Sequence, residues 1–343
     1  MPALLEYECP ACGGGLEFDP LLQKVKCPYC ESEFDVADLK GKDVPPAEQP
    51  QQEQMNTYIC KSCGGEILCD DSTAATHCPY CDSPVVMKER LAGTLRPDLV
   101  VPFKLDKAAA KAALQQHISG KVLLPKCFKS ENRIDRIQGM YVPFWLYDAD
   151  TDADASFSAT VVRHWSDRDY NYTQTKYYEV ERAGSMLFEA VPVDASTKMA
   201  NELMESIEPY DLSQAVDYQS AYLAGYIADK YDVQSDVTQS RAEERMREGA
   251  IDALRDTVSS SYTSVNLTTS NVNFTDIRIR YALLPVWILC TKYQGKDYTF
   301  AMNGQTGKMV GNLPMDKTAF WLWFAGISVI GTALAYLLGM LLR

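Results

Sequence analysis

Histidine is scarce in this sequence, and acidic residues outnumber basic ones. The 343 residues include three histidines and 33 lysines and arginines, against 46 aspartates and glutamates, and the formal net charge is −13. Proteins that bind DNA or RNA gain much of their affinity from lysines and arginines that neutralise phosphates. The charge balance therefore argues against nucleic acid as a partner.

Recognisable catalytic motifs are also lacking. The sequence has no P-loop and no Gly-x-Gly-x-x-Gly fingerprint, and His77, His117 and His164 fall in a cysteine knuckle, at a helix end and in a strand. We expect no enzymatic activity, no catalytic residue and no organic cofactor. The N-terminus lacks the basic region and apolar run of a signal peptide, so we expect the N-terminal body to stay in the cytoplasm.

Cysteine, in contrast, is concentrated at one end of the chain. Nine of the eleven cysteines precede residue 82, and eight of them form two C-x2-C-x14-C-x2-C patterns at a constant offset of 51. Four cysteines complete the tetrahedral coordination of zinc and leave no position open for catalysis. The sequence therefore predicts two structural Zn²⁺ ions, with the ligand sets Cys9, Cys12, Cys27 and Cys30, and Cys60, Cys63, Cys78 and Cys81.

Two residues near the second set are alternative ligands. Cys69 stands where the first copy has Phe18, which favours a small apolar strand residue, and His77 stands where the first copy has Lys26. Residues 1–40 and 56–90 carry net charges of −5 and −2, so a phosphate backbone would be repelled. We expect two separately folded ribbons that bind another protein.

The composition divides the chain into five parts. We predict zinc ribbon 1 at 1–40, a flexible linker at 41–56, zinc ribbon 2 at 57–90, an α+β domain with antiparallel sheet at 95–315, and a transmembrane helix at 318–342. Within the domain, the patterns predict a helix between Asp106 and Gly120, helical structure from 196 to 257, and hairpin turns at Gln294-Gly295 and Asn303-Gly304.

Two features of the strand regions have more than one interpretation. An Asp-rich stretch, Asp148 to Asp154, predicts a solvated turn between two strands, since it lacks the glycine and closing glutamate of a calcium loop. The phrases "YVPFW" and "LLPVW" each place a proline two residues before a tryptophan, which indicates either an internal duplication or two strands of similar composition. A proline inside a strand predicts an edge position or a bulge.

The last 26 residues contain the longest apolar run. From Thr318 to Leu342 there are 25 residues without a charge, long enough as a helix, about 37 Å, to cross a bilayer. The alternative is a buried core helix. We expect a single-pass anchor in the cell membrane, and the small residues Gly331, Ala335 and Gly339 on one face leave room for a homo-oligomer formed through this helix.

The order of these motifs resembles a family of bacterial membrane proteins. The duplicated CxxC ribbons, "VPFW", "LPVW", "NGQTGK" and the C-terminal helix are similar to proteins labelled transcription factor IIB-type zinc-ribbon or primosomal-helicase-like. Members are often encoded beside phage-shock-type and flotillin-like (SPFH) proteins. The resemblance implies an adaptor that recruits such a protein partner to the membrane during envelope stress. A membrane-tethered regulator that binds nucleic acid through its ribbons is the alternative.

Overall fold

The protein is described by a computed structural model that covers residues 9–12, 16–42, 56–59, 66–69, 96–125, 128, 134–229 and 231–341. The second predicted ligand set, Cys60, Cys63, Cys78 and Cys81, lies outside the described residues, as do His77 and most of the predicted linker. The boundaries drawn through these segments remain predictions.

The N-terminal part forms one small antiparallel sheet and a hairpin that belongs to the large sheet. Strands β1 (Glu17–Asp19), β2 (Lys24–Lys26) and β3 (Glu33–Phe34) pair in that order and lead into the 3-10 helix η1 (Val36–Lys42). Strands β4 (Asn56–Ile59) and β5 (Glu66–Cys69) form a hairpin, so Cys69 is a strand residue, as expected.

A large mixed sheet builds the rest of the body. Its main path runs β13-β12-β11-β7-β10-β5-β4, and β6, β8 and β9 pair off this path. The central strands are β7 (Gln138–Ser166) and β11 (Ser264–Tyr293). The others are β6 (Leu99–Val100), β8 (Asn171–Asp194), β9 (Val216–Asp217), β10 (Ile227–Asp229), β12 (Lys296–Asn303) and β13 (Met309–Gly311).

The helices are α1 (Lys107–Ile118), α3 (Asn201–Ser206), α4 (Ser235–Asp256) and α5 (Lys317–Leu341), with the 3-10 turns η3 (Leu212–Gln214) and η4 (Ser220–Leu223). Helix α1 begins and ends as predicted. The Asp106 side chain accepts the backbone N–H of Ala109 at 2.8 Å, and Gly120 takes a positive φ just past the end.

The large sheet is mostly antiparallel, as predicted, but two of its strand pairs are parallel. Strand β6 runs parallel to β11, and β10 runs parallel to β7. These two short strands occupy equivalent places, because the central strands pair with each other around Val142 and Leu284. Pro143 lies opposite Leu283, and Pro285 lies opposite Tyr141. The two proline-tryptophan phrases are therefore related by an approximate two-fold axis.

The symmetry extends to whole units. The first repeat consists of β6, α1, β7 and β8, and the second of β10, α4, β11 and β12. In each repeat a parallel strand leads through a short loop to a helix, then to a long central strand and its hairpin partner. The choice between duplication and similar composition is settled in favour of a structural repeat.

The prolines lie inside the sheet, neither at its edge nor in a bulge. The outer neighbour of β7 changes from β10, at Tyr141, to β8, at Phe144. The carbonyl of Pro143 accepts the N–H of Ala195 at 3.0 Å, and that of Pro285 accepts the N–H of Gly304 at 2.8 Å. In an antiparallel strand, N and C=O of one residue point to the same side. The N–H that Pro143 lacks would therefore point to the side where the neighbour of β7 changes from β10 to β8.

The tryptophans of the two phrases have matching roles. The indole N–H of Trp145 donates to the carbonyl of Val233 at 2.9 Å, and that of Trp287 donates to the carbonyl of Leu105 at 3.0 Å. Val233 and Leu105 each lie directly before the residue that caps a helix. Each tryptophan therefore holds the entry to the helix of one repeat.

Two local predictions fail for tertiary reasons. The apolar spacing in 220–229 predicted helix, but η4, a turn at Gly225 with φ +82°, and strand β10 occupy this segment. Residues Ile227–Asp229 are fully buried, and pairing with β7 and β5 overrides the helical pattern. The Asp-rich stretch is no turn: Asp148, Asp150, Asp152 and Asp154 lie within β7, spaced along one side of the strand.

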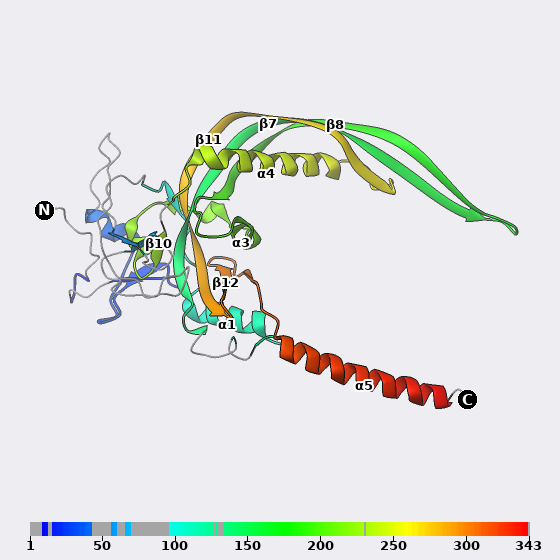
Figure 1. Ribbon diagram of the computed structural model, residues 1–343. Coiled ribbons are helices and arrows are strands. Elements are labelled where there is room, and N and C mark those ends of the chain that lie inside the picture. Colours follow the sequence, from blue (N-terminus) through cyan, green and yellow to red (C-terminus); the bar gives the residue numbers. More distant parts are fainter. Residues whose placement is uncertain are drawn as a thin grey trace.

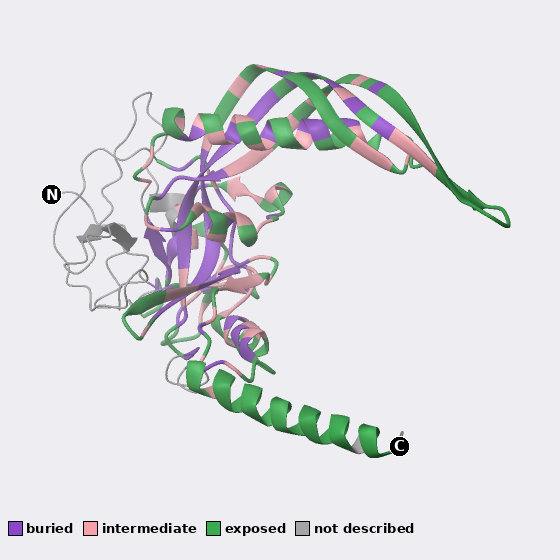
Figure 2. Ribbon diagram, turned by 45° about the vertical axis from the view of Figure 1, so that its right-hand side comes forward, coloured by how far each residue is buried: buried purple, intermediate pink, exposed green. Residues whose placement is uncertain are grey.

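The long strands form a curved blade. In Figure 1, β7, β8 and β11 bend away from the body, and α4 runs along their inner side. Figure 2 shows buried residues concentrated in the central strands and on this inner side. Beyond Thr160, β7 pairs with β8 alone, so the blade ends in a two-stranded arm.

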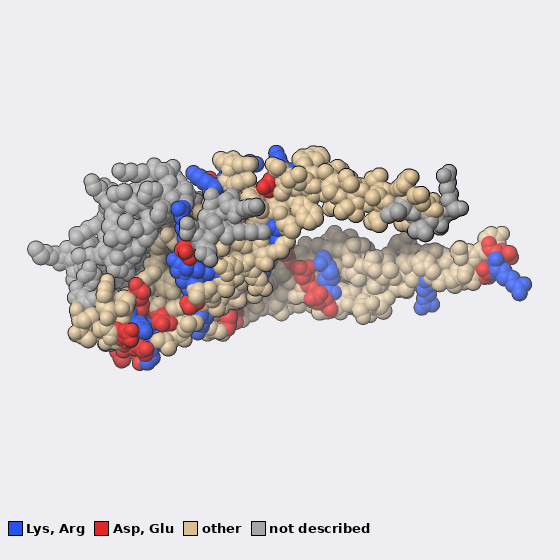
Figure 3. Space-filling view, turned by 90° about the horizontal axis from the view of Figure 1, so that it is seen from below, with Lys and Arg blue, Asp and Glu red and all other residues tan. Residues whose placement is uncertain are grey.

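Helix α5 leaves the body at the opposite end (Figure 1). Asp316 caps it by accepting the N–H groups of Thr318 and Ala319, and the Asp316 N–H donates to the carbonyl of Leu123 at 2.8 Å. The helix is long and apolar enough to cross a membrane, and none of its apolar window is buried. The helix is thus not part of this chain's core, contrary to the alternative prediction, and Figure 3 shows a long stretch of it without Lys, Arg, Asp or Glu.

Candidate metal centre

The first predicted ligand set converges in space. The sulfur atoms of Cys9, Cys12, Cys27 and Cys30 all lie within 4.8 Å of one another, and two pairs, Cys9–Cys30 and Cys12–Cys27, lie at 3.5 Å. Four thiolates on a tetrahedral zinc ion, each at about 2.3 Å, lie about 3.8 Å apart. The four cysteines are therefore close enough to bind one metal ion.

The second half of the site is a tight turn after β2. The carbonyl of Cys27 accepts the N–H of Glu31, and the N–H of Cys27 donates to the carbonyl of Ser32, both at 2.9 Å. Glu31 has φ +60°, a conformation uncommon for a residue with a side chain. This turn brings Cys27 and Cys30 to the same point, with Cys27 buried and Cys30 exposed.

The electrostatics of the turn favour thiolate. Hydrogen bonds from the hydroxyl and backbone of Ser32, and contact with Cys9, lower the pKa of Cys30 to about 6. Among the residues that the structure describes, Cys9, Cys27 and Cys30 are in no disulfide that would compete for these sulfurs. A metal ion binds the deprotonated form, which a lowered pKa supplies at neutral pH.

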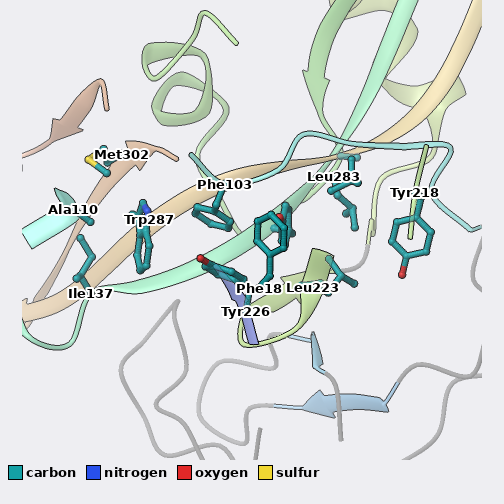
Figure 4. Close-up of a cluster of buried hydrophobic side chains, with 14 of the residues drawn as sticks. Phe18, Phe103, Ala110, Ile137, Tyr218, Leu223, Tyr226, Leu283, Trp287 and Met302 are labelled. Carbon is teal, nitrogen blue, oxygen red and sulfur yellow. The ribbon is translucent and has the colours of Figure 1, made fainter. Parts of the chain in front are cut away.

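The ribbon does not fold as a separate unit, contrary to the sequence prediction. The N–H of Phe18 donates to the carbonyl of Ala224 at 3.0 Å, and the Gln23 side chain donates to the carbonyl of Phe103 at 2.7 Å. The Phe18 ring packs edge-on against Tyr222 at 5.3 Å. In Figure 4, Phe18 lies in the same apolar cluster as side chains of the sheet, because a three-stranded ribbon is too small to bury its own core.

The hairpin β4–β5, within predicted ribbon 2, is joined to the body as well. Ile67 pairs with Asp229 and Leu68 with Ala228, which makes β5 a strand of the large sheet. Ribbon 1 thus shares its core with the body, so the expectation of an independent unit is wrong for this ribbon. In predicted ribbon 2, the described strand β5 pairs with the large sheet, and the four predicted cysteine ligands lie outside the described residues.

A groove of about 520 Å³ lies at the seam between the ribbon and the body. One wall comes from β1, β2 and the turn between them, and the other from the start of α1, the start of β7 and the segment before β10. Leu21, at the ribbon side, is 67% exposed, and Tyr29, between two cysteines, is 78% exposed. The sequence carries a signal for the second residue, since CPYC places a tyrosine between two ligands in both copies.

Acidic groups gather around the same seam. Glu17, Asp19 and Asp106 act together on Tyr226, and burial followed by these three charges raises the pKa of this phenol above its usual value. Lys26, which pairs with Glu17 across β1 and β2, and Lys107 also line the groove. The groove therefore presents apolar and weakly acidic surface beside the cysteine cluster.

These features define a protein class: a mixed α+β body that carries a four-cysteine centre and ends in an apolar helix. Over 332 aligned residues, the chain is 35% identical to the uncharacterized protein YdjG of Bacillus subtilis strain 168. The alignment covers 97% of this chain and 96% of YdjG. The chain belongs to the same family as YdjG. A scan of protein-family models and a search of solved structures both find no match.

Proposed function

We propose that this chain is a non-enzymatic, zinc-binding adaptor that docks a protein partner at the bacterial cell membrane. The observation that carries the proposal is the groove beside the cysteine cluster, which the exposed side chain of Leu21 lines from the turn between β1 and β2. The exposed side chain of Tyr29 lies on the neighbouring turn between Cys27 and Cys30. Exposed apolar residues that gather at a groove mark interaction sites.

The membrane part of the proposal is supported by α5. Its exposed side chains are apolar on all sides, as a lipid environment requires. We propose that the body lies on the cytoplasmic side, and the resemblance of the motifs favours a flotillin-like or phage-shock-type partner in envelope stress.

The metal is proposed to be zinc at two sites. The first site fits a closed tetrathiolate, and the second set repeats the same spacing at Cys60, Cys63, Cys78 and Cys81. Bound zinc would hold the turn that carries Tyr29 and supply folding energy to the ribbons. Metal analysis of the purified chain is expected to give two zinc ions, falling to one in Cys27→Ser; one or none in the native chain contradicts the proposal.

Site-specific photocrosslinking tests the docking groove. A photoreactive amino acid at position 21 or 29 of the full chain, expressed in its native membranes, is expected to give a discrete protein adduct. The same residue at position 150, exposed on the blade, is the matched control and should give none. Loss of the adduct in Cys27→Ser would link docking to the metal. If neither position 21 nor position 29 gives an adduct, the proposal is contradicted.

The alternative function, binding of nucleic acid, makes an opposite prediction. The groove and ribbon surface carry more carboxylates than lysines, and log affinity for DNA would fall with log salt as counterions are released. If the chain in detergent shifts labelled DNA or RNA at low salt, and the shift is lost in Cys27→Ser, the alternative replaces the adaptor.

A further inference from the structure

A second pocket, of about 440 Å³, lies where β8 ends and α4 begins. Its walls come from the end of β8, the turn that leads to α3, and the first two turns of α4. Its lining includes Val193, Asp194, Thr197, Met199, Val237 and Arg241. The volume falls within the range of small-molecule sites.

Asp194 is the unusual member of this lining. Its side chain is 7% exposed, its Oδ1 accepts the N–H of Ser196 at 3.2 Å, and its Oδ2 is buried with no hydrogen-bond partner. A buried carboxylate oxygen without a partner costs free energy, so native structures rarely keep one without a use.

The second repeat shows what a purely structural residue looks like at the same place. Asn303 pairs with Val286 as Asp194 pairs with Phe144, and these positions match under the two-fold axis. The Asn303 amide donates to the carbonyls of Ile207 and Pro209 and accepts the N–H groups of Gln305 and Thr306. The Asn303 amide is fully satisfied by its own chain, whereas Asp194, which lines the pocket, keeps one buried oxygen without a hydrogen-bond partner.

The charge around the pocket is negative. Titratable groups from six segments surround the pocket. They are Asp229 on β10, Asp232 in the loop after β10, Lys198 in the turn after β8, Glu205 on α3, Tyr210 after α3, and Arg241 on α4. Lys198 pairs with Asp229 at 2.9 Å, and Arg241 pairs with Glu205 at 2.7 Å. With these pairs neutral, Asp232, together with Asp194 once it is ionised, leaves an excess of negative charge that favours a cation.

We propose that this pocket binds an alkylammonium group, with the ammonium on Asp194 Oδ2 and the alkyl stem against Val193, Met199 and Val237. The same chemistry is carried by a small free amine and by a lysine side chain. An ammonium donates three hydrogen bonds and would supply the missing partner of Oδ2. The apolar walls exclude water from the stem and would strengthen the ion pair.

The proposal carries a pH dependence with a definite sign. Burial, together with the charges of Asp229 and Asp232, raises the pKa of Asp194 to about 8. Binding of a cation requires the ionised carboxylate, so it releases a proton below this pH. The apparent affinity should rise about 50-fold from pH 6 to pH 8, because the ionised fraction rises by that factor.

Titration calorimetry on the full chain in detergent micelles tests the site, in a buffer without amines. The probes are n-butylamine, Nα-acetyl-lysine amide, neutral n-butanol and MgCl₂. Saturable binding of either amine supports the site, and the stronger of the two identifies the source of the ammonium. Binding of neither amine, or binding of Mg²⁺ alone, overturns the proposal.

Variants separate the pocket from the fold. Asp194→Asn should abolish amine binding, and Val237→Trp, at a side chain that is 65% exposed, should weaken it at least 10-fold by closing the mouth. Asp150→Asn, on the exposed side of the blade, is the matched control and should bind like the native chain. If Asp194→Asn does not fold, Val237→Trp decides, and unchanged binding in Val237→Trp overturns the proposal.

Discussion

The two repeats share a plan but differ in length. The hairpin partner of the first repeat, β8, has 24 residues, and that of the second, β12, has 8. Helix α4 has 22 residues and packs on the long hairpin, whereas α1 has 12 residues and contacts β13 beside the short one. The longer helix therefore accompanies the longer hairpin, and in each case the helix and the hairpin belong to different repeats.

The conserved part of the plan lies at the start of each helix. Ala110, Leu114 and Ile118 are the buried residues of α1, and Thr238, Ala242 and Met246 occupy the matching buried positions of α4. The comparison shows that the tryptophan bond, the parallel strand and the first two helical turns are common, while the blade was extended on one side only.

The largest expected effect comes from the two tryptophans. Trp145→Ala and Trp287→Ala should each lower the free energy of unfolding by about 4 kcal/mol, because each removes a buried ring and a hydrogen bond to a helix entry. Urea unfolding of the full chain in micelles measures both. A loss below about 1 kcal/mol at either position would break the equivalence of the repeats.

The next effect separates the repeats at their matched polar positions. Asn303→Asp should cost about 3 kcal/mol, since it places a carboxylate oxygen against the carbonyls of Ile207 and Pro209. Asp194→Asn should cost less, because Oδ2 has no hydrogen-bond partner to lose. Equal losses in the same urea assay would contradict the distinction between the two residues.

A smaller effect concerns the residue after each of these positions. A Cβ at Gly304 would lie 2.6 Å from the Phe103 ring and 2.9 Å from Pro285, so Gly304→Ala should destabilise by about 2 kcal/mol through overpacking. Ala195 occupies the equivalent place and is fully buried, and Ala195→Gly should cost about 1 kcal/mol. A stabilising Gly304→Ala would show that the loops of the repeats are interchangeable.

The last effect is a pH dependence of stability, which is small for each unit of pH and belongs to Asp194. Because its pKa is about 8 in the folded chain and lower when unfolded, the folded state holds its proton more tightly. Stability from this group is therefore complete below pH 4 and declines toward pH 8, by about 1 kcal/mol per pH unit. Asp194→Asn should flatten the profile between pH 5 and pH 8, and an unchanged slope would place the titration elsewhere.

The sequence predicted best where local chemistry decides. The spacing of Cys9, Cys12, Cys27 and Cys30, the cap at Asp106, and the charge-free run of α5 each depend on residues close in the chain. The type I′-like turn at Gln294-Gly295, where both residues have positive φ, is of the same kind.

What the sequence could not predict depends on distant neighbours. Strand β10 has three residues, and only its position between β7 and β5 makes it a strand. The repeat is hidden because matched positions share burial but not identity, as with Leu114 and Ala242. The pocket at Asp194 required knowledge of which polar atoms are left without a partner, which no pattern in the chain records.

The backbone hydrogen bond from Asp316 to Leu123 joins the start of α5 to the first repeat without a flexible linker. A membrane helix joined by a long flexible linker would leave the attached domain free to reorient above the lipid. Here the helix begins one residue after the backbone hydrogen bond from Asp316 to the body. If α5 lies in a bilayer as proposed, the body keeps a set stand-off height and tilt. The groove beside the cysteines is then held at a fixed distance from the membrane surface. The helix therefore sets this distance as well as attaching the protein to the membrane.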